Sequence, residues 1–313
     1  MAPPIATVDV PASSANLGSG FDCFAAALSL KLRAELHEGD QPGITVNAHG
    51  EGSALVEAEG GNSPVLRAFR EGLRTAGGPQ GGSAAWRIEV SSMIPAARGL
   101  GSSAAAIVAG VLLGASVGRL SPGPDELLAL AAWLEGHPDN VAAALYGGVT
   151  VATAGGDRDE KPVMRRFRVP EAWIPVVFVA QAQSRTNEMR AALPARVPHA
   201  DATAQVARAA LLATAILTSD AGLLRTAMAD RLHQPYRLPM LPGTAELIDT
   251  AYRIGAAGAC LSGAGPSVLA ICDSPITAHS VEKAWNAAGV AGMATRLRFD
   301  TTGARLEAPE PPG

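Results

Sequence analysis

The segment PAARGLGSSAAA, residues 95–106, contains the residue types from which proteins build anion sites. Gly99 and Gly101 allow backbone conformations with positive φ. Ser102 and Ser103 can cap a following helix and can offer hydroxyl groups to a phosphate or a metal ion. The first turn of that helix would direct free N–H groups and a partial positive charge to the same place. The segment lacks the lysine of a Walker A motif, so a plain Gly-Ser turn before a capped helix explains it equally well.

Two further segments combine glycine with other small residues. SANLGSGFD, residues 14–22, has Asn16 and Asp22 as its strong polar groups. LSGAGPSV, residues 261–268, contributes Ser262, Gly263 and Gly265. Taken singly, each segment is explained as a turn, with Asn16 shaping the turn and Asp22 capping a helix. Three such segments in one chain favour a site where the backbone surrounds a nucleotide.

The segment EGHPDN, residues 135–140, places further polar groups together. Glu135 by itself is typical of a surface carboxylate at a helix end, and a lone histidine such as His137 is more often structural than catalytic. We expect Asp139 and Asn140 to form a turn or to support neighbouring groups. No pair of histidines has metal-ligand spacing, so a zinc site is not expected.

Composition narrows the class of protein. The chain has 313 residues and a net charge of −4, and its densest basic stretch is MRRFR at 164–168, so nucleic acid is not an expected partner. The cysteines, Cys23, Cys260 and Cys272, are odd in number and widely spaced, which argues against a disulfide framework.

The uncharged run 99–118 is built from Ala and Gly, which favours a buried helix over a membrane span. No basic leader precedes an apolar run at the N-terminus, so we expect a cytoplasmic protein that has no membrane partner.

Hydrophobic periodicity predicts an α+β fold in two parts. Alternating or continuous apolar runs predict strands at 5–10, 30–38, 43–50, 84–92, 145–153, 173–181, 293–299 and in both halves of 259–273. Helices are predicted at 63–74, after Gly101, and at 125–135, 202–218, 221–230, 244–253 and 277–288. We expect an N-terminal nucleotide-binding domain over 1–155, a C-terminal domain over 156–300 and a disordered Pro-rich tail over 301–313.

The three glycine-rich segments, in this order along the chain, resemble the signature motifs of the GHMP kinase superfamily. PAARGLGSSAAA is similar to its phosphate-binding motif and CLSGAGPSVLAI to its C-terminal motif. Within the superfamily, VPASSANLGSGFDC and EGHPDNVAAALYGG resemble the homoserine kinases. The similarity runs from about Val8 to Ile271. Two positions depart from the pattern, because Ser19 and Ala143 stand where these kinases often have proline.

This resemblance implies a fold and an activity. The fold would be a GHMP kinase-like pair of domains, with an N-terminal domain similar to ribosomal protein S5 domain 2 and a ferredoxin-like C-terminal domain. The activity would be magnesium- and ATP-dependent phosphorylation of the side-chain hydroxyl of L-homoserine, a step of threonine biosynthesis. The resemblance leaves the choice between a monomer and a homodimer open.

The resemblance also assigns residues to ATP and Mg²⁺. The implied ATP-binding residues are Asn62, Pro95, Ala97, Arg98, Gly99, Leu100, Gly101, Ser102 and Ser103. The implied metal ligands are Glu135 and the hydroxyl of Ser102, with Ser103 as the alternative to Ser102. Mg²⁺ keeps several of its waters, so one carboxylate is sufficient.

The acceptor substrate would lie against a second group of residues. The implied contacts are Asn16, Asp22, His137, Thr186, Arg190 and Arg237, and the implied catalytic set is Asn16, Asp22 and Glu135. Arg185 is the alternative to Arg190, and whether any residue acts as a general base stays open. Another GHMP kinase that acts on a different alcohol, or a nucleotide-binding regulator without activity, is the competing interpretation. A carboxylate such as Asp22 would serve no purpose for an alcohol without an ammonium group, which favours an amino acid.

Overall fold

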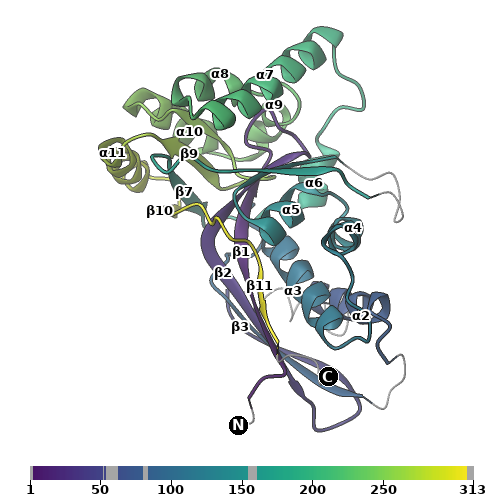
Figure 1. The fold of residues 1–313 in the computed structure, drawn as a ribbon. Helices are drawn as coiled ribbons and strands as arrows, with labels where there is room; N and C mark the ends of the chain where they lie inside the picture. The colour runs from purple at the N-terminus through teal and green to yellow at the C-terminus, as the bar shows by residue number, and fades with distance from the viewer. Residues whose placement is uncertain (1–2, 52, 54–62, 80–83, 154–160, 309–313) are drawn as a thin grey trace.

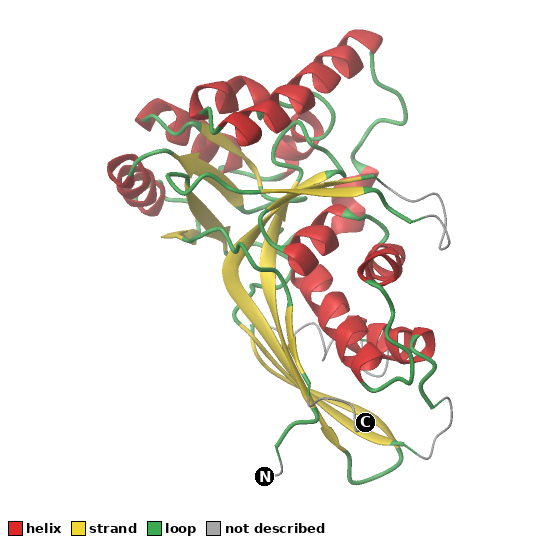
Figure 2. Cartoon of the chain, viewed as in Figure 1, coloured by secondary structure: helices red, strands yellow, loops and turns green. Residues whose placement is uncertain are grey.

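The computed structural model describes residues 3–51, 53, 63–79, 84–153 and 161–308 and folds them into two units, each built on one sheet (Figures 1 and 2). In Figure 1 the first unit forms the lower part of the molecule and the second unit the upper part. Strands and helices are mixed within both units, so the predicted α+β class is confirmed.

The first unit contains a seven-stranded sheet in which β11, β1, β2, β4 and β3 are successive neighbours, while β5 pairs with β2 and β6. Its strands are β1 (Ala6–Ala15), β2 (Phe24–Glu38), β3 (Gly43–Gly50), β4 (Ala85–Ser92), β5 (Val149–Ala152), β6 (Met164–Phe167) and β11 (Arg305–Glu307). Its helices are α2 (Pro64–Thr75), α3 (Ser102–Ser116), α4 (Pro124–Glu135) and α5 (Asp139–Tyr146). These helices lie along one face of the sheet (Figure 1).

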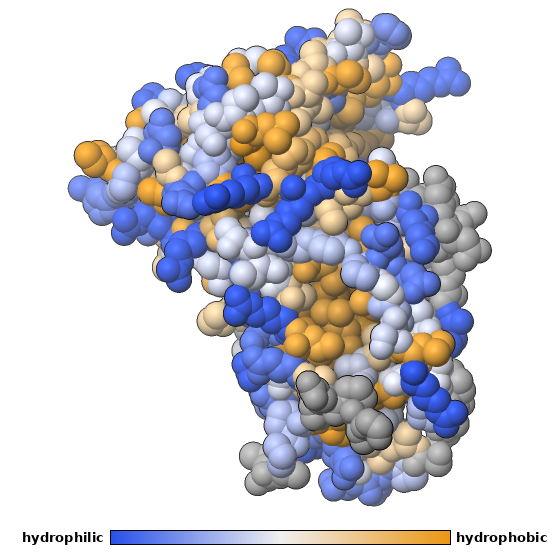
Figure 3. Space-filling view, in the orientation of Figure 1, coloured by the Kyte–Doolittle hydropathy of each residue, from blue (hydrophilic) through white to orange (hydrophobic). Residues whose placement is uncertain are grey.

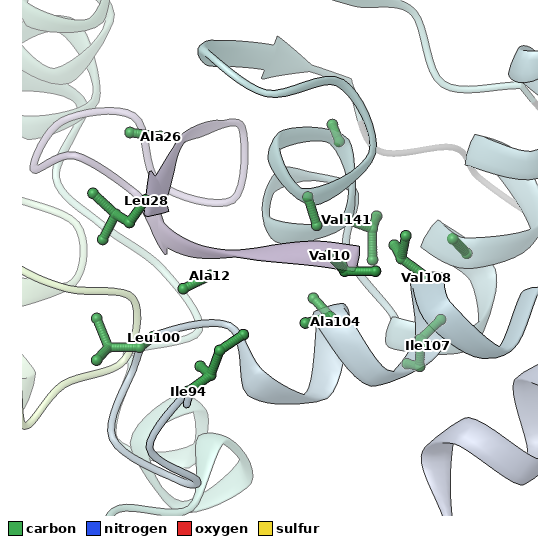
Figure 4. Close-up of a cluster of buried hydrophobic side chains, with 14 of the residues drawn as sticks. Val10, Ala12, Ala26, Leu28, Ile94, Leu100, Ala104, Ile107, Val108 and Val141 are labelled. Carbon is green, nitrogen blue, oxygen red and sulfur yellow. The ribbon is translucent and has the colours of Figure 1, made fainter. Parts of the chain in front are cut away.

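The main core of the first unit lies between that sheet and α3 and α5. Val10 of β1 lies among Ala104 and Val108 of α3 and Val141 of α5 (Figure 4), and all four side chains are buried. Ala12 continues the same face two residues along β1, as the period of a strand requires. The uncharged run that begins at Gly99 is therefore explained by burial in this core, as predicted.

Small residues let α3 approach α2 closely. A methyl group added at Gly110 would lie 2.3 Å from the carbonyl oxygen of Val65, and one at Gly114 would lie 2.1 Å from that of Phe69. Both contacts are to backbone, which cannot move aside as a side chain can. This close packing fixes the axis of α3, and hence the position of its N-terminus.

The second unit contains a four-stranded antiparallel sheet in the order β10-β7-β9-β8. Its strands are β7 (Ile174–Ala180), β8 (Gly258–Leu261), β9 (Val268–Cys272) and β10 (Gly292–Arg296). Its α-helices are α6 (Thr186–Ala191), α7 (His199–Thr218), α8 (Leu224–Ala227), α9 (Gln234–Arg237), α10 (Thr244–Ile254) and α11 (Pro275–Asn286), and its 3₁₀ turns are η2 (Ala221–Leu223) and η3 (Leu238–Met240). Along the chain the order is one strand, several helices, a hairpin, one helix and a last strand, and the four strands lie in the spatial order 4-1-3-2. This arrangement is a ferredoxin-like unit, as the resemblance implied.

The structure corrects several expected boundaries. Residues 145–146 belong to α5, because the strand begins only after the turn at Gly147 and Gly148. The helix expected over 221–230 is a 3₁₀ turn followed by the single turn α8. The join expected at residue 155 falls later, since β6 still pairs with β5 of the first sheet. The expected disordered tail contains β11, which pairs antiparallel with β1.

Helix α7 is, among the described residues, the one helix whose length and apolar composition would suffice to cross a membrane. This is weak support for a span, because partly buried helices of other proteins have the same composition. Asp201 of α7 forms an ion pair with Arg231, and Gln205 bonds to the Ser19 carbonyl, so two polar side chains tie the helix to the protein. Figure 3 shows apolar and hydrophilic side chains intermixed over the upper part of the molecule.

Candidate active site

The three glycine-rich segments, far apart in sequence, meet in the structure. The Ser262 hydroxyl donates to the Gly99 carbonyl oxygen at 2.7 Å. The Asn16 amide donates to the Gly263 carbonyl oxygen at 2.8 Å, and the Gly263 N–H donates to the Ala15 carbonyl oxygen at 3.1 Å. Each segment is thus bonded to at least one of the others through its backbone, which joins the end of β1, the loop before α3 and the β8–β9 hairpin.

Glycine is required where these segments touch. Gly99 has a φ of 77°, and a methyl group there would lie 2.2 Å from the carbonyl oxygen of Ser262. Gly101 has a φ of 69°, and its methyl group would lie 2.1 Å from the Ser13 hydroxyl. Positive φ is strained for residues with a β-carbon. Both glycines of the loop therefore serve two purposes, since they permit the turn and the contact with a neighbouring segment.

Residues other than glycine also have positive φ at this place. Asn16, Leu17, Asp22 and Ala97 have φ values of 73°, 42°, 56° and 54°. Such conformations are uncommon outside glycine, cost of order 1–3 kcal/mol each and cluster at binding and catalytic sites. Their concentration in two of the three motifs supports a site held in one fixed arrangement.

The N-terminus of α3 is open to an anion. The helix begins behind Gly101, no side chain of the described residues caps it, and its first turn contains no acidic residue. We expected Ser102 and Ser103 to be able to cap this helix, but both lie inside its first turn. The first N–H groups of a helix have no partner within it, and the helix dipole adds partial positive charge there. The phosphate loop, residues 95–103, therefore has the backbone donors that a phosphate group needs.

Ser103 and Glu135 form the pair that could hold a cation beside this loop. The Ser103 hydroxyl donates to the Glu135 carboxylate at 2.8 Å. Ser102, the other serine that the resemblance offers as a metal ligand, is buried one residue earlier on α3, and it is Ser103 that contacts Glu135. Burial raises the pKa of Glu135, while His137 and the bond from Ser103 act against that shift. A bound cation would also favour the ionised carboxylate.

His137 contributes a cation beside the same carboxylate. Its Nδ1 lies 2.7 Å from Asp139 Oδ1, which also accepts the Asn140 N–H at 2.6 Å. Burial acts to lower the pKa of His137, but the bond to Asp139 and the charges of Asp139 and Glu135 outweigh it and raise the pKa to about 9. The Asn140 amide oxygen accepts from the Ser13 hydroxyl at 2.8 Å, which attaches α5 to β1. His137 is therefore positively charged at neutral pH.

The acceptor cluster, defined as Asp22, Arg190 and Arg237, lies beside these groups. Arg190 of α6 holds the Asp22 carboxylate with two bonds, of 2.8 and 2.9 Å, and the Asp22 N–H donates to the Asn16 side-chain oxygen at 3.0 Å. Arg237 is 2% exposed. The Phe21 ring lies against both guanidinium groups, 5.8 Å from that of Arg190 and 5.3 Å from that of Arg237.

Burial and charge affect the two arginines in different ways. The hydrogen bond and the charge of Asp22 raise the pKa of Arg190. Burial lowers the pKa of Arg237, although Asp22 opposes this shift. Arginine stays protonated in either case. Two arginines and one carboxylate therefore lie close together, and the charge of Asp139 also acts on both guanidinium groups.

Other predicted residues have less direct support. Thr186 is exposed at the first position of α6, and Arg185 precedes it as the N-cap, so neither is bonded into the cluster. Arg98 donates to the Gln181 carbonyl oxygen at 3.3 Å and pairs with Glu51 at 3.8 Å. Pro95, Ala97 and Leu100 lie in the phosphate loop as expected, whereas Asn62 lies outside the described residues.

The sequence analysis missed several residues that assemble the site. Ser184 donates its hydroxyl to the Gly265 carbonyl oxygen at 2.7 Å and its N–H to the Ala97 carbonyl oxygen at 3.0 Å. Phe21 lies within a segment that we singled out, but its contact with two arginines depends on the fold. No local signal in the sequence marks Ser184, because its two partners lie in loops about 80 residues to either side.

Two family models and several curated proteins match the chain. The family model of the GHMP kinases N terminal domain matches residues 63–148, and that of the GHMP kinases C terminal matches residues 212–291. The chain is 41% identical over 266 residues to the homoserine kinase of Moorella thermoacetica, covering 85% of this chain and 86% of the relative. It is 38% identical over 310 residues to that of Synechococcus sp. (strain CC9311), covering 96% and 95%.

Comparison with a solved structure shows that the similarity extends to the fold. The crystal structure of homoserine kinase from Cytophaga hutchinsonii superposes with a TM-score of 0.84 at 25% identity, covering 98% of this chain and 99% of that one. The chain therefore belongs to the GHMP kinases, a family of phosphotransferases, and the resemblance of its glycine-rich motifs is confirmed. Within that family it belongs to the homoserine kinases, because relatives of that name match it over most of its length.

Proposed function

We propose that the protein transfers the γ-phosphoryl group of ATP to the side-chain hydroxyl of L-homoserine. The observation that carries the proposal is the acceptor cluster: one carboxylate and two guanidinium groups, of which Arg237 bonds to the same hairpin that bonds to the phosphate loop. A zwitterionic amino acid offers an ammonium group to Asp22 and a carboxylate to the two arginines, for which the planar guanidinium is well suited. The kinases of this name among the relatives support the choice of homoserine.

The phosphate loop would bind the phosphates of ATP. The free N–H groups of the first turn of α3 and the backbone around Gly99 and Gly101 provide the donors. Ser103 and Glu135 would hold Mg²⁺, and they fit it because they supply two oxygen ligands and leave the remaining positions to water and phosphate. When bound, the ion neutralises charge on the phosphates. No group of three or more His, Cys, Asp or Glu side chains that could form a fuller cage occurs among the residues that the structure describes.

The proposed chemistry needs positioning and charge more than proton transfer. Phosphoryl transfer passes through a loose transition state, so little basic assistance to the attacking hydroxyl is required. The Asp139 carboxylate already accepts from His137 and from the Asn140 N–H, and the Asn140 amide cannot take up a proton. We therefore propose no general base, and the hydroxyl proton leaves with the phosphoryl oxygens. His137 adds a positive charge at the acceptor, and Asn16 orients Asp22.

The test is ADP release by the purified protein with MgATP and a panel of alcohols. The panel consists of L-homoserine, D-homoserine, L-threonine, L-serine, mevalonate and galactose. We expect turnover with L-homoserine alone, and phosphohomoserine as its product. Turnover with another alcohol would retain the phosphotransferase and overturn the acceptor assignment. ATP binding without any turnover would support a nucleotide-binding regulator.

Two further parts of the proposal concern where and in what form the enzyme acts. We propose that it acts in the cytoplasm, because both proposed substrates, ATP and a free amino acid, are present there. We also propose a homodimer, which light scattering after size-exclusion chromatography would test by comparing the mass in solution with 31.8 kDa per chain. A mass of one chain at working concentration would overturn it.

A further inference from the structure

His233 is a buried histidine that the proposed chemistry does not use. Its side chain is fully buried at the N-cap of α9, four residues before Arg237. Its Nε2 lies 2.9 Å from the Gly18 carbonyl oxygen, and its Nδ1 lies 3.3 Å from Arg237 Nη1. Its ring stacks on Phe21 at 5.1 Å between centroids. One imidazole therefore touches the SANLGSGFD segment and an arginine of the acceptor cluster.

The two partners determine the tautomer of His233. A carbonyl oxygen can only accept a hydrogen bond, so Nε2 must carry the proton that points at Gly18. A guanidinium can only donate, so Nδ1 must present its lone pair to Arg237. The ring is therefore neutral, with its proton on Nε2. Burial lowers the pKa of His233, and the positive charge of Arg237 adds to this shift, although Asp230 and Asp22 oppose it.

Asp230 is the nearest carboxylate to the ring, but it is engaged elsewhere. Its Oδ2 lies 3.6 Å from His233 Nε2 and accepts the backbone N–H groups of His233 and Gln234. Its Oδ1 accepts from the Leu232 N–H and the Gln205 side chain. These four donors stabilise the Asp230 charge and fix the turn that carries the imidazole.

Among the described residues, the hydrogen-bond partners of Arg237 are neutral. Its guanidinium donates to the carbonyl oxygens of Met189 and Gly263, at 3.3 and 3.4 Å, in addition to His233. Within the described part of the chain no carboxylate forms an ion pair with it, whereas Arg190 is paired with Asp22. Uncharged acceptors fix the orientation of Arg237 without neutralising it, so its charge stays available for an incoming carboxylate.

We propose that His233 is a positioning residue of the acceptor site, which fixes the Arg237 guanidinium relative to the Gly18 backbone through its neutral imidazole. This inference rests on the proposed function, in which Arg237 binds the acceptor carboxylate. Among the described residues no hydrogen bond or ring contact joins His233 to the phosphate loop, so we expect its role to be specific to the acceptor. Loss of the Nδ1 acceptor therefore weakens binding of the amino acid and leaves binding of ATP unchanged.

Two amide substitutions test the two hydrogen bonds of His233 separately. An asparagine amide ends near the position of Nδ1, and a glutamine amide reaches that of Nε2. His233→Asn keeps an acceptor for Arg237, and His233→Gln keeps a donor for Gly18. His233→Phe keeps the stacking on Phe21 and loses both bonds. His279→Gln, at an exposed histidine of α11, is the matched control.

Steady-state kinetics with L-homoserine and ATP provide the readout. We expect His233→Gln to raise the KM for homoserine about tenfold, the loss associated with one hydrogen bond to a charged group, and His233→Asn about threefold. His233→Phe should match or exceed His233→Gln. The kcat and the KM for ATP should stay within about twofold of the parent protein, because uniform binding of one substrate is what is lost. In an Arg237→Gln background, His233→Gln should add less than about twofold, since both act through one interaction.

Several results would overturn the positioning role of His233. A rise in the KM for ATP equal to that for homoserine, or full additivity with Arg237→Gln, would overturn the positioning role and leave a structural one. Thermal unfolding identifies any variant that fails to fold; if none of the three folds, the role is structural and the inference is overturned. A parent protein that is inactive with homoserine would overturn the proposed function, and this inference with it. An active parent with an unchanged homoserine KM in His233→Gln would overturn this inference alone.

Discussion

The phosphate loop and the acceptor cluster recognise charge with different parts of the chain. The phosphate loop presents backbone N–H groups, and its geometry is fixed by Gly99 against a backbone carbonyl and by Gly101 against the Ser13 hydroxyl. The acceptor cluster presents three charged side chains from the segment after β1, from α6 and from α9. The groups that form the backbone site come from a few consecutive residues, whereas those of the side-chain site come from segments that are far apart in the sequence. Substitutions in the phosphate loop should therefore affect activity differently from substitutions in the acceptor cluster.

The largest effect is expected from adding a methyl group to the phosphate loop. In Gly99→Ala the new β-carbon would meet a backbone carbonyl of the neighbouring loop at 2.2 Å, so the two loops must separate. We expect kcat/KM to fall by about a thousandfold, comparable with removal of a main stabilising donor of a transition state. Gly289→Ala is the matched control, because Gly289 has a similar φ of 73° and open space around it. Equal losses in the two variants would show that backbone strain, and not loop contact, is responsible.

The carboxylate at the boundary between the two halves should have the next largest effect. Glu135→Gln keeps the shape of the side chain but removes the negative charge that would hold Mg²⁺. We expect kcat to fall about a hundredfold and the Mg²⁺ concentration for half-maximal activity to rise. Glu171→Gln, at a carboxylate that is 83% exposed, controls for the loss of charge alone. An unchanged Mg²⁺ requirement would remove Glu135 from the metal site.

A substitution in the acceptor cluster should leave the binding of ATP almost unchanged. Arg190→Gln removes both bonds to Asp22 and one of the two cations for the acceptor carboxylate. We expect the KM for homoserine to rise about thirtyfold, whereas the KM for ATP changes little. Arg168→Gln, at an exposed arginine, is the control. A parallel rise in both KM values would contradict the division of the site into two halves.

The last predicted effect concerns stability and its dependence on pH. Because the pKa of His137 is raised from 6.5 to about 9 in the folded protein, its contribution to stability is fully present below pH 6.5 and is lost as the pH rises through 9. Between pH 6.5 and 9 the free energy of unfolding of the parent should fall by about 2 kcal/mol relative to His137→Gln. Urea titrations of both proteins at several pH values measure the difference. Parallel curves would place the pKa of His137 near its ordinary value.

The same contrast explains what could be predicted from the sequence. Gly99, Gly101 and the helix after them follow from local residue types, and so do most strands. Sequence alone could not choose between Ser102 and Ser103, because only the rotation of α3 decides which hydroxyl faces Glu135. Arg190 and Arg237 would be surface arginines by composition, and they were found only through the resemblance. β11 was missed because three exposed residues beside a Pro-rich end have no periodicity, and their pairing with β1 comes from the fold.

The order of the strands has a mechanical consequence. Because β1 to β6 and β11 share one sheet, the ferredoxin-like unit is an insertion within the first unit, and two stretches of chain connect them. The second stretch leaves the ferredoxin-like unit beside β7, since the Leu297 N–H donates to the Pro175 carbonyl oxygen at 2.9 Å and so extends the antiparallel pairing of β10 with β7. Two covalent connections restrict the relative rotation of the two units more than a single connection would. Any opening that admits substrate therefore has to occur with both connections intact, and closure restores the hydrogen bond between Gly263 and Ala15.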